Sequence, residues 1–178
     1  MPRRVVVAGT SGSGKTTLAA RIAHVIEAPH VEIDALFHGP GWTRRPEFAS
    51  DVEAFTSRPE WVTEWQYPEV RELLAERADL LVWLDLSRST VVRQVVRRTL
   101  GRKVRRQRLW NGNVEPPLRT FFTDPDHIVR WAWRTHSTTA ARVAAVRPDL
   151  PVVHLRSHAE AEQWLQGTCA RAARDRLR

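Results

Sequence analysis

The sequence predicts an α/β protein in which helices cover both faces of a parallel sheet of five strands. Short apolar segments alternate with segments of helical periodicity along the chain, as expected when strands are buried on both faces. A glycine-rich loop joins the first apolar segment to the first helical one. The 178 residues are enough for one domain with a substantial core, so we expect a single domain over residues 1–178.

The glycine-rich loop spans residues 9–16, GTSGSGKT, and fits the pattern G-x-x-x-x-G-K-[ST] at every fixed position. A buried strand is expected at 4–8 and a helix over 17–27. Backbone N–H groups of such a loop close around phosphate oxygens, while Lys15 reaches the β- and γ-phosphates and the Thr16 hydroxyl ligates Mg²⁺. We therefore predict a site for a nucleoside triphosphate. We assign to it Gly9, Gly12, Ser13, Gly14, Lys15, Thr16 and Thr17.

Four further strands follow the loop. We expect them at residues 29–33, 61–65, 79–85 and 150–155. Helices are expected at residues 46–57, 68–77, 90–100, 124–146 and 157–166, the last with Ser157 and Glu160 as a capping box. Residues 35–45 contain glycine, proline and aromatic residues without a period, which indicates a loop. In the helix over 90–100 we expect an inward face made of Val91, Val92, Val95, Val96 and Leu100.

Two acidic residues lie near the ends of predicted strands. Asp34 follows the second strand, and Glu64 is near the end of the third. Ligands bind at the carboxyl ends of the strands in sheets of this kind, so both residues should converge with the loop glycines. Asp34 is a candidate to accept the proton of an acceptor hydroxyl or to hold Mg²⁺ through water, with capping of the next turn as the alternative. Glu64 is a candidate for the water shell of Mg²⁺.

Composition and charge restrict the partners. The net charge of +8 favours an anionic partner, which is a nucleotide, a nucleic acid or a membrane surface. Cys169 is the only cysteine, so an intrachain disulfide is excluded, and we expect an exposed or half-buried thiol. No apolar run approaches membrane-spanning length, and the first strand begins too early for a signal peptide. A soluble cytoplasmic protein is therefore expected.

Further motifs lie beyond the loop. Trp61, Glu64 and Tyr67 form a Trp-x-x-acid-x-x-Tyr pattern, an apolar strand ends in Asp85, and a basic stretch without acids covers 88–113. With the loop and Asp34, these features make the chain resemble the adenylate-kinase-like P-loop kinases. The segments 82–88, 130–136 and 152–157 bring it nearest to the FlaR-type group of DNA topology modulation proteins. The resemblance implies a three-layer α/β/α fold with strand order 2-3-1-4-5, an acceptor-binding insert at 35–60 and a basic lid at 101–118.

The resemblance also implies roles for arginines. Arg93 would lie near the nucleotide base, Arg97 would touch the transferred phosphate, and Arg134 would complete the clamp from the helix after the lid. The secondary lid candidates are Arg102, Arg105 and Arg106. The plainer interpretation of this group is a solvated basic face.

The acceptor side departs from the family pattern. Relatives place Asp-Gly-Asn where this chain has Glu64-Trp65-Gln66, so Trp65 is expected to fill space that glycine leaves open and to alter or remove the acceptor pocket. The candidates to line an acceptor site are Trp42, Arg44, Arg45 and Tyr67. There a tryptophan would stack on a base and an arginine would bind phosphate.

The sequence as a whole predicts a phosphotransferase that depends on ATP and Mg²⁺ and acts on a nucleoside, nucleotide or similar hydroxyl acceptor. One alternative is a nucleotide-regulated protein that binds nucleic acid through the basic stretch at 88–108. Another is a bare NTPase with water as acceptor, which a lid that excludes water argues against. The identity of the acceptor, the choice between ATP and GTP and the oligomeric state stay open at this point.

Overall fold

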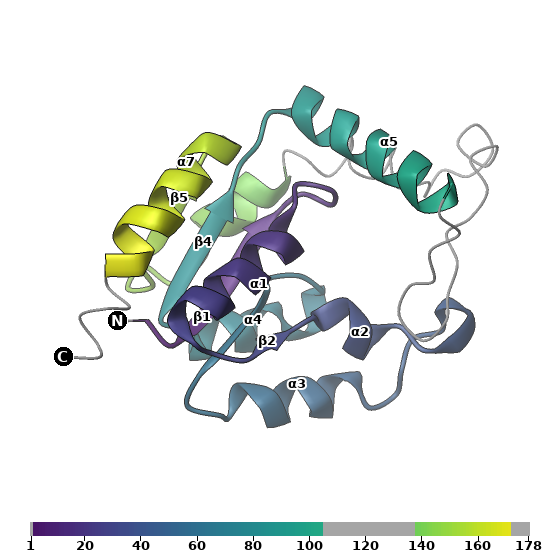
Figure 1. The fold of residues 1–178 in the computed structure, drawn as a ribbon. Coiled ribbons are helices and arrows are strands. Elements are labelled where there is room, and N and C mark those ends of the chain that lie inside the picture. The colour runs from purple at the N-terminus through teal and green to yellow at the C-terminus, as the bar shows by residue number, and fades with distance from the viewer. Residues whose placement is uncertain (1, 105–137, 172–178) are drawn as a thin grey trace.

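Five strands form one parallel sheet in the order β2-β3-β1-β4-β5 in the computed structural model, which describes residues 2–104 and 138–171. The strands are β1 (Arg4–Gly9), β2 (His30–Val31), β3 (Trp61–Glu64), β4 (Leu80–Leu84) and β5 (Val152–Leu155). The parallel sheet and the predicted strand order are confirmed. The strand that carries the glycine-rich loop, β1, lies in the middle, between β3 and β4 (Figure 1).

Helices follow the strands in chain order. They are α1 (Lys15–Ile26), α2 (Ile33–Phe37), α3 (Phe48–Thr56), α4 (Pro68–Arg77), α5 (Arg88–Val104) and α7 (His158–Trp164), and residues 138–144 are also helical. Two shorter segments are the 3₁₀ turn η1 (Pro40–Trp42) and the π-helical turn η4 (Leu165–Cys169). No helix in the described part of the chain is both long and apolar enough to cross a membrane.

Side chains on the two faces of β1 enter two different cores. Val5 and Val7 pack with residues of α1, α5 and α7, whereas Val6 and Ala8 pack with residues of α3 and α4. Each of these four side chains is at most 1% exposed. A strand buried on both faces has no polar alternation, which explains why β1 is a continuous apolar run in the sequence. The result is the expected three-layer arrangement of helices, sheet and helices.

The chain turns into a helix sooner after β2 than the sequence predicts. A strand over 29–33 and a loop over 35–45 are expected, but β2 holds only two residues and α2 begins at Ile33. Ile33 is fully buried, and its backbone N–H donates to a Glu64 carboxylate oxygen 3.1 Å away. Asp34 therefore lies in the first turn of a helix instead of directly at the end of a strand.

The helix predicted over 90–100 is longer than expected. It is α5, and its last turn takes in the first residues of the lid predicted at 101–118, while the lid from residue 105 onward lies outside the described residues. Val91 and Val95 are buried as predicted, but Val96 is 41% exposed. Val91 and Val95 are four residues apart and share the buried face of α5, whereas Val96 is turned by roughly 100° from Val95 around the helix and lies beyond that face.

The C-terminal helix begins with the predicted cap. The Ser157 hydroxyl accepts a hydrogen bond from the Glu160 N–H at 3.1 Å, and the Glu160 carboxylate accepts one from the Arg156 N–H at 2.8 Å. The expectation of an exposed or half-buried Cys169 is wrong. Cys169 is only 5% exposed, because η4 places it against the core shared with α1, and burial raises the pKa of its thiol to about 11.

Candidate active site

The loop after β1 has the backbone that phosphate binding requires. Gly12 and Gly14 have φ values of 85° and 93°, in the left-handed region that favours glycine. The Ser13 N–H donates to Thr10 O at 3.0 Å and tightens the turn. Gly14 forms the N-cap of α1 without a side-chain capping bond, so N–H groups of the first turn of α1 are left for a ligand. The strand, loop and helix therefore fit the phosphates of a nucleotide.

Substitution of the two glycines is expected to lower the free energy of unfolding by different amounts. A Cβ on Gly12 would lie 2.1 Å from Val95 Cγ2 of α5, whereas the nearest atom to a Cβ on Gly14 is 3.8 Å away. Gly14→Ala is thus expected to lower the free energy of unfolding by about 1–2 kcal/mol, the cost of its backbone conformation. Gly12→Ala should lower it by about 1–3 kcal/mol more, because α5 must also move. Urea unfolding of the nucleotide-free protein measures both, and equal losses would contradict this packing of α5 on the loop.

Lys15 lies at the centre of a buried group of charges. Its burial lowers the pKa of its ammonium group, while Asp34 and Glu64 act to raise that pKa and Arg98 acts to lower it. The structure thus brings together Lys15 and the two strand-end acids singled out in the sequence. Arg98 joins them from α5. Its position depends on the path of α5, which the sequence pattern does not give.

Glu64 is held by protein groups on both carboxylate oxygens. Oε1 lies 3.3 Å from His30 Nε2, and Oε2 accepts the hydrogen bond from the Ile33 N–H. Burial by itself would raise the pKa of Glu64, but the hydrogen bonds from His30 and Ile33 outweigh it, so the pKa lies below its usual value. The predicted role at Mg²⁺ stays a prediction. What the contacts support is that Glu64 fixes the first turn of α2, and with it Asp34.

Asp34 accepts two hydrogen bonds on the same oxygen, Oδ1. One comes from the Gln66 side-chain amide and the other from the Tyr67 hydroxyl at 2.6 Å. Burial raises the pKa of Tyr67, and the neighbouring Asp34 raises it further, so the phenol stays protonated and donates. Tyr67 has a strained φ of 63° and is held by the ring of Phe37, stacked at a centroid distance of 4.0 Å. The carboxylate of Asp34 is therefore oriented and fixed.

Trp65 lies on the other side of the chain from the acceptor residues. It is 7% exposed, its indole N–H donates to Arg71 O of α4 at 2.9 Å, and it belongs to the core around α3 and α4. Trp65 therefore fills space in this core, and the expected alteration of the acceptor pocket stays a prediction. Successive side chains of an extended segment point to opposite sides, so Gln66 reaches Asp34 while Trp65 enters the core.

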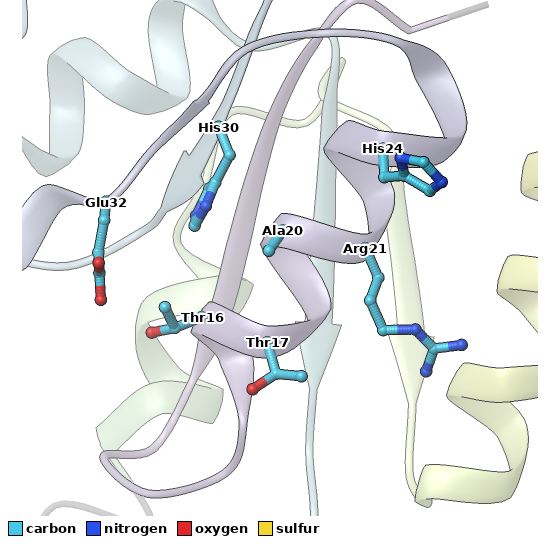
Figure 2. Close-up of a pocket in the computed structure, with 7 residues that line it drawn as sticks. All are labelled: Thr16, Thr17, Ala20, Arg21, His24, His30 and Glu32. Atoms are coloured by element: carbon cyan, nitrogen blue, oxygen red, sulfur yellow. The ribbon is translucent and has the colours of Figure 1, made fainter.

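An open pocket of ≈ 540 Å³ lies between α1 and the segment from β2 to α2. Figure 2 shows Thr16 and Glu32 with their oxygens on the same side of this pocket, whereas Arg21 points away toward its partner Glu162. Mg²⁺ commonly takes one or two protein oxygens and keeps several waters, and this pair of oxygen ligands fits it. Sequence reasoning missed Glu32, although an acid two residues before Asp34 at the end of a strand is a signal for such a role.

The remaining predicted residues whose side chains are described are mainly exposed. Arg93 and Arg97 are exposed on α5, and Arg134 and the lid arginines fall outside the residues whose side chains are described. Trp42 is 37% exposed beside His38, with ring centroids 5.0 Å apart. Arg44 is paired with a neighbouring carboxylate and does not point to a free anion site.

Solved structures of kinases share this fold. A gluconokinase from Sinorhizobium meliloti 1021 is 20% identical, with 99% of this chain and 96% of that chain covered and a TM-score of 0.54. A shikimate kinase from Acinetobacter baumannii in complex with shikimate is 14% identical over 99% and 96% of the two chains, with a TM-score of 0.56. A shikimate kinase from Bacteroides thetaiotaomicron is 15% identical over 93% and 95%, with a TM-score of 0.54.

The chain therefore has the fold of the P-loop kinases, related to that of adenylate kinase. No protein-family model matches the sequence, and no curated protein matches it significantly. The likeness is one of fold, at identities too low to carry over an activity. The narrower resemblance to the FlaR-type group and the basic lid are not confirmed.

Proposed function

We propose that the protein is a kinase that transfers the γ-phosphoryl group of ATP, with Mg²⁺, to a hydroxyl group of a small molecule. The observation that carries the proposal is that the carboxylate of Asp34, oriented by Tyr67, lies close enough to Lys15 on the phosphate-binding loop to raise the pKa of its ammonium group. Phosphoryl transfer needs neutralised phosphates and an aligned nucleophile more than it needs covalent chemistry. A buried cation beside a fixed carboxylate provides for both.

Each residue then has a definite task. The loop N–H groups and Lys15 bind the β- and γ-phosphates, and Thr16 and Glu32 hold Mg²⁺, which would neutralise charge on the phosphate oxygens. Asp34 accepts the proton of the acceptor hydroxyl. At the same time the oxygen of that hydroxyl forms a bond to the γ-phosphorus, and the bond between the γ-phosphorus and ADP breaks. Arg97 and Arg134 stay proposed partners of the transferred phosphate, and Arg93 of the base. Residues 35–60 are proposed as the acceptor-binding segment.

Asp34→Asn is expected to lower kcat by about 10²–10⁴-fold, because the amide cannot take up the hydroxyl proton. The amide oxygen can still accept from Gln66 and Tyr67, so the site should keep its shape. The Kd for ATP should stay within about threefold, since the change affects the transition state more than nucleotide binding. Single-turnover kinetics and equilibrium ATP binding measure the two quantities, and a kcat near that of the wild type would remove Asp34 from the mechanism.

The decisive experiment for the function is ADP release from ATP and Mg²⁺ in the presence of a panel of nucleosides, nucleotides and sugar-type alcohols. Turnover that depends on one class of acceptor is expected. ATP binding without any acceptor-dependent turnover would overturn the proposal. In that case, DNA binding that weakens steeply with salt would favour the nucleic-acid alternative.

A further inference from the structure

We propose that the acceptor is an uncharged molecule with a flat ring, of the chemical class of a nucleoside, and that this ring stacks on Trp42. The inference rests on the proposed kinase function, since it concerns the substrate that delivers its hydroxyl to Asp34. Two features carry it. One is a run of contacting aromatic side chains that leads away from Asp34, and the other is the pairing of the two arginines beside that run.

The aromatic run begins at the carboxylate and ends at an exposed indole. The Tyr67 hydroxyl bonds to Asp34 at 2.6 Å and lies 3.3 Å from His38 Nε2. The His38 ring in turn meets Trp42, with the ring planes at 82°. Trp42 is 37% exposed, on a turn where its φ is 62°. One acceptor could thus place its flat ring on Trp42 and its hydroxyl group at Asp34. Stacking of bases on aromatic side chains is favourable.

The arginines beside the run are already paired. Arg44 binds Glu69 through two nitrogens, with Nη2 at 2.5 Å and Nε at 3.4 Å from the carboxylate oxygens. Arg45 is 2.9 Å from Asp51 and donates to the carbonyl of Leu36 at 3.2 Å. Neither side chain therefore presents an unneutralised charge to an acceptor. From the sequence we expected Arg44 to bind a phosphate of the acceptor. Its pairing with Glu69 instead disfavours an acceptor that carries a phosphate.

The other groups near the run also disfavour an anion. Burial lowers the pKa of His38, so the ring is neutral at neutral pH. The carboxylate of Asp34 would repel a second carboxylate or a phosphate held close to it. Lys15 is neutralised in part by Asp34 and Glu64 and is committed to the nucleotide phosphates. Beside the aromatic run itself, Arg44 and Arg45 are both paired with carboxylates.

Glu69 then determines, through its pairing with Arg44, whether the site favours an uncharged or an anionic acceptor. It lies on α4 and its ion pair with Arg44 is partly exposed, so removing its charge should leave folding intact. Glu69→Gln would release Arg44 and give an anionic acceptor the partner that it lacks. A higher kcat/KM for a charged acceptor would show that the released Arg44 binds it. A substitution that only damages the protein would lower kcat/KM for every acceptor.

The test compares a nucleoside with an analogue that carries a carboxylate on its base and keeps every hydroxyl group, as acceptors for the full-length protein, measured as ADP release. We expect kcat/KM to be at least about tenfold higher for the nucleoside. Glu69→Gln should reduce this ratio at least about threefold by lowering the KM of the carboxylate analogue. Glu76→Gln, the same change at an exposed position of the same helix, is the matched control and should leave the ratio unchanged.

Trp42 gives a second and independent readout. Trp42→Ala should raise the KM for the nucleoside at least about tenfold while kcat changes less than about threefold, and Trp42→Phe should restore most of the binding. Val152→Ala, at an apolar position exposed on the opposite edge of the sheet, is the control. A preference for the carboxylate analogue or for a sugar acid, with Trp42→Ala unchanged, would overturn the inference and leave the kinase standing. No acceptor-dependent ADP release at all would overturn both.

Discussion

Replacing Lys15 by alanine is expected to reduce kcat/KM for phosphoryl transfer by at least about a thousandfold, because one buried cation stabilises the charge that develops on the phosphates. Lys15 is only 9% exposed, so water screens its charge poorly and the charge acts strongly on bound phosphates. ADP release under single-turnover conditions measures the loss. Lys15→Met, which keeps the length of the side chain without its charge, should lose as much, and Arg58→Ala at an exposed position should lose less than about twofold.

The same substitution should do little to folding. Burial lowers the pKa of Lys15 in spite of the attraction of Asp34 and Glu64, so the folded protein gains no net stability from this charge. The nucleotide-free Lys15→Met variant is therefore expected to unfold within about 1 kcal/mol of the wild type. A variant that unfolds much more easily would mean that Lys15 mainly supports the fold, and its lost activity would then say nothing about catalysis.

The loop and its surroundings could be predicted because their signals are local. The glycines, Lys15 and Thr16 follow one another in the chain, and the apolar runs on either side give the strand and the helix. Asp34 could be predicted from a general rule about the ends of parallel strands. These features need no knowledge of how distant parts of the chain pack.

The rest of the site depends on contacts between distant segments. Trp65 packs in the core around α3 and α4, and this depends on where those helices lie relative to β3, which the family pattern does not give. Arg98 meets Lys15 only because α5 passes over the loop. The exposure of Val96 also depends on packing, since hydrophobic periodicity marks a face but not where the neighbouring core ends. Such features follow from packing, which a single sequence does not display.

Glu64→Ala is expected to lower the free energy of unfolding by about 1.5–3 kcal/mol, the range for hydrogen bonds to a charged group. The substitution leaves His30 and the Ile33 N–H without their common partner. Urea unfolding at neutral pH measures the change. Glu72→Gln, at an exposed position on α4, should change stability by less than about 0.5 kcal/mol. A loss of that small size for Glu64→Ala would mean that α2 is held by other contacts.

The pH dependence of this loss tests whether the charge of Glu64 is responsible. Its pKa is lowered in the folded protein from 4.5, so its contribution is present above that pH and disappears as the pH falls through the lower folded value. The difference in stability between the wild type and Glu64→Gln should therefore be largest at neutral pH and shrink in acid below about pH 4.5. Gln keeps an oxygen for the Ile33 N–H but carries no charge. A difference that stays constant into acid would assign the stabilisation to hydrogen bonding and packing, and Lys15 would then be held without an ionised partner at Glu64.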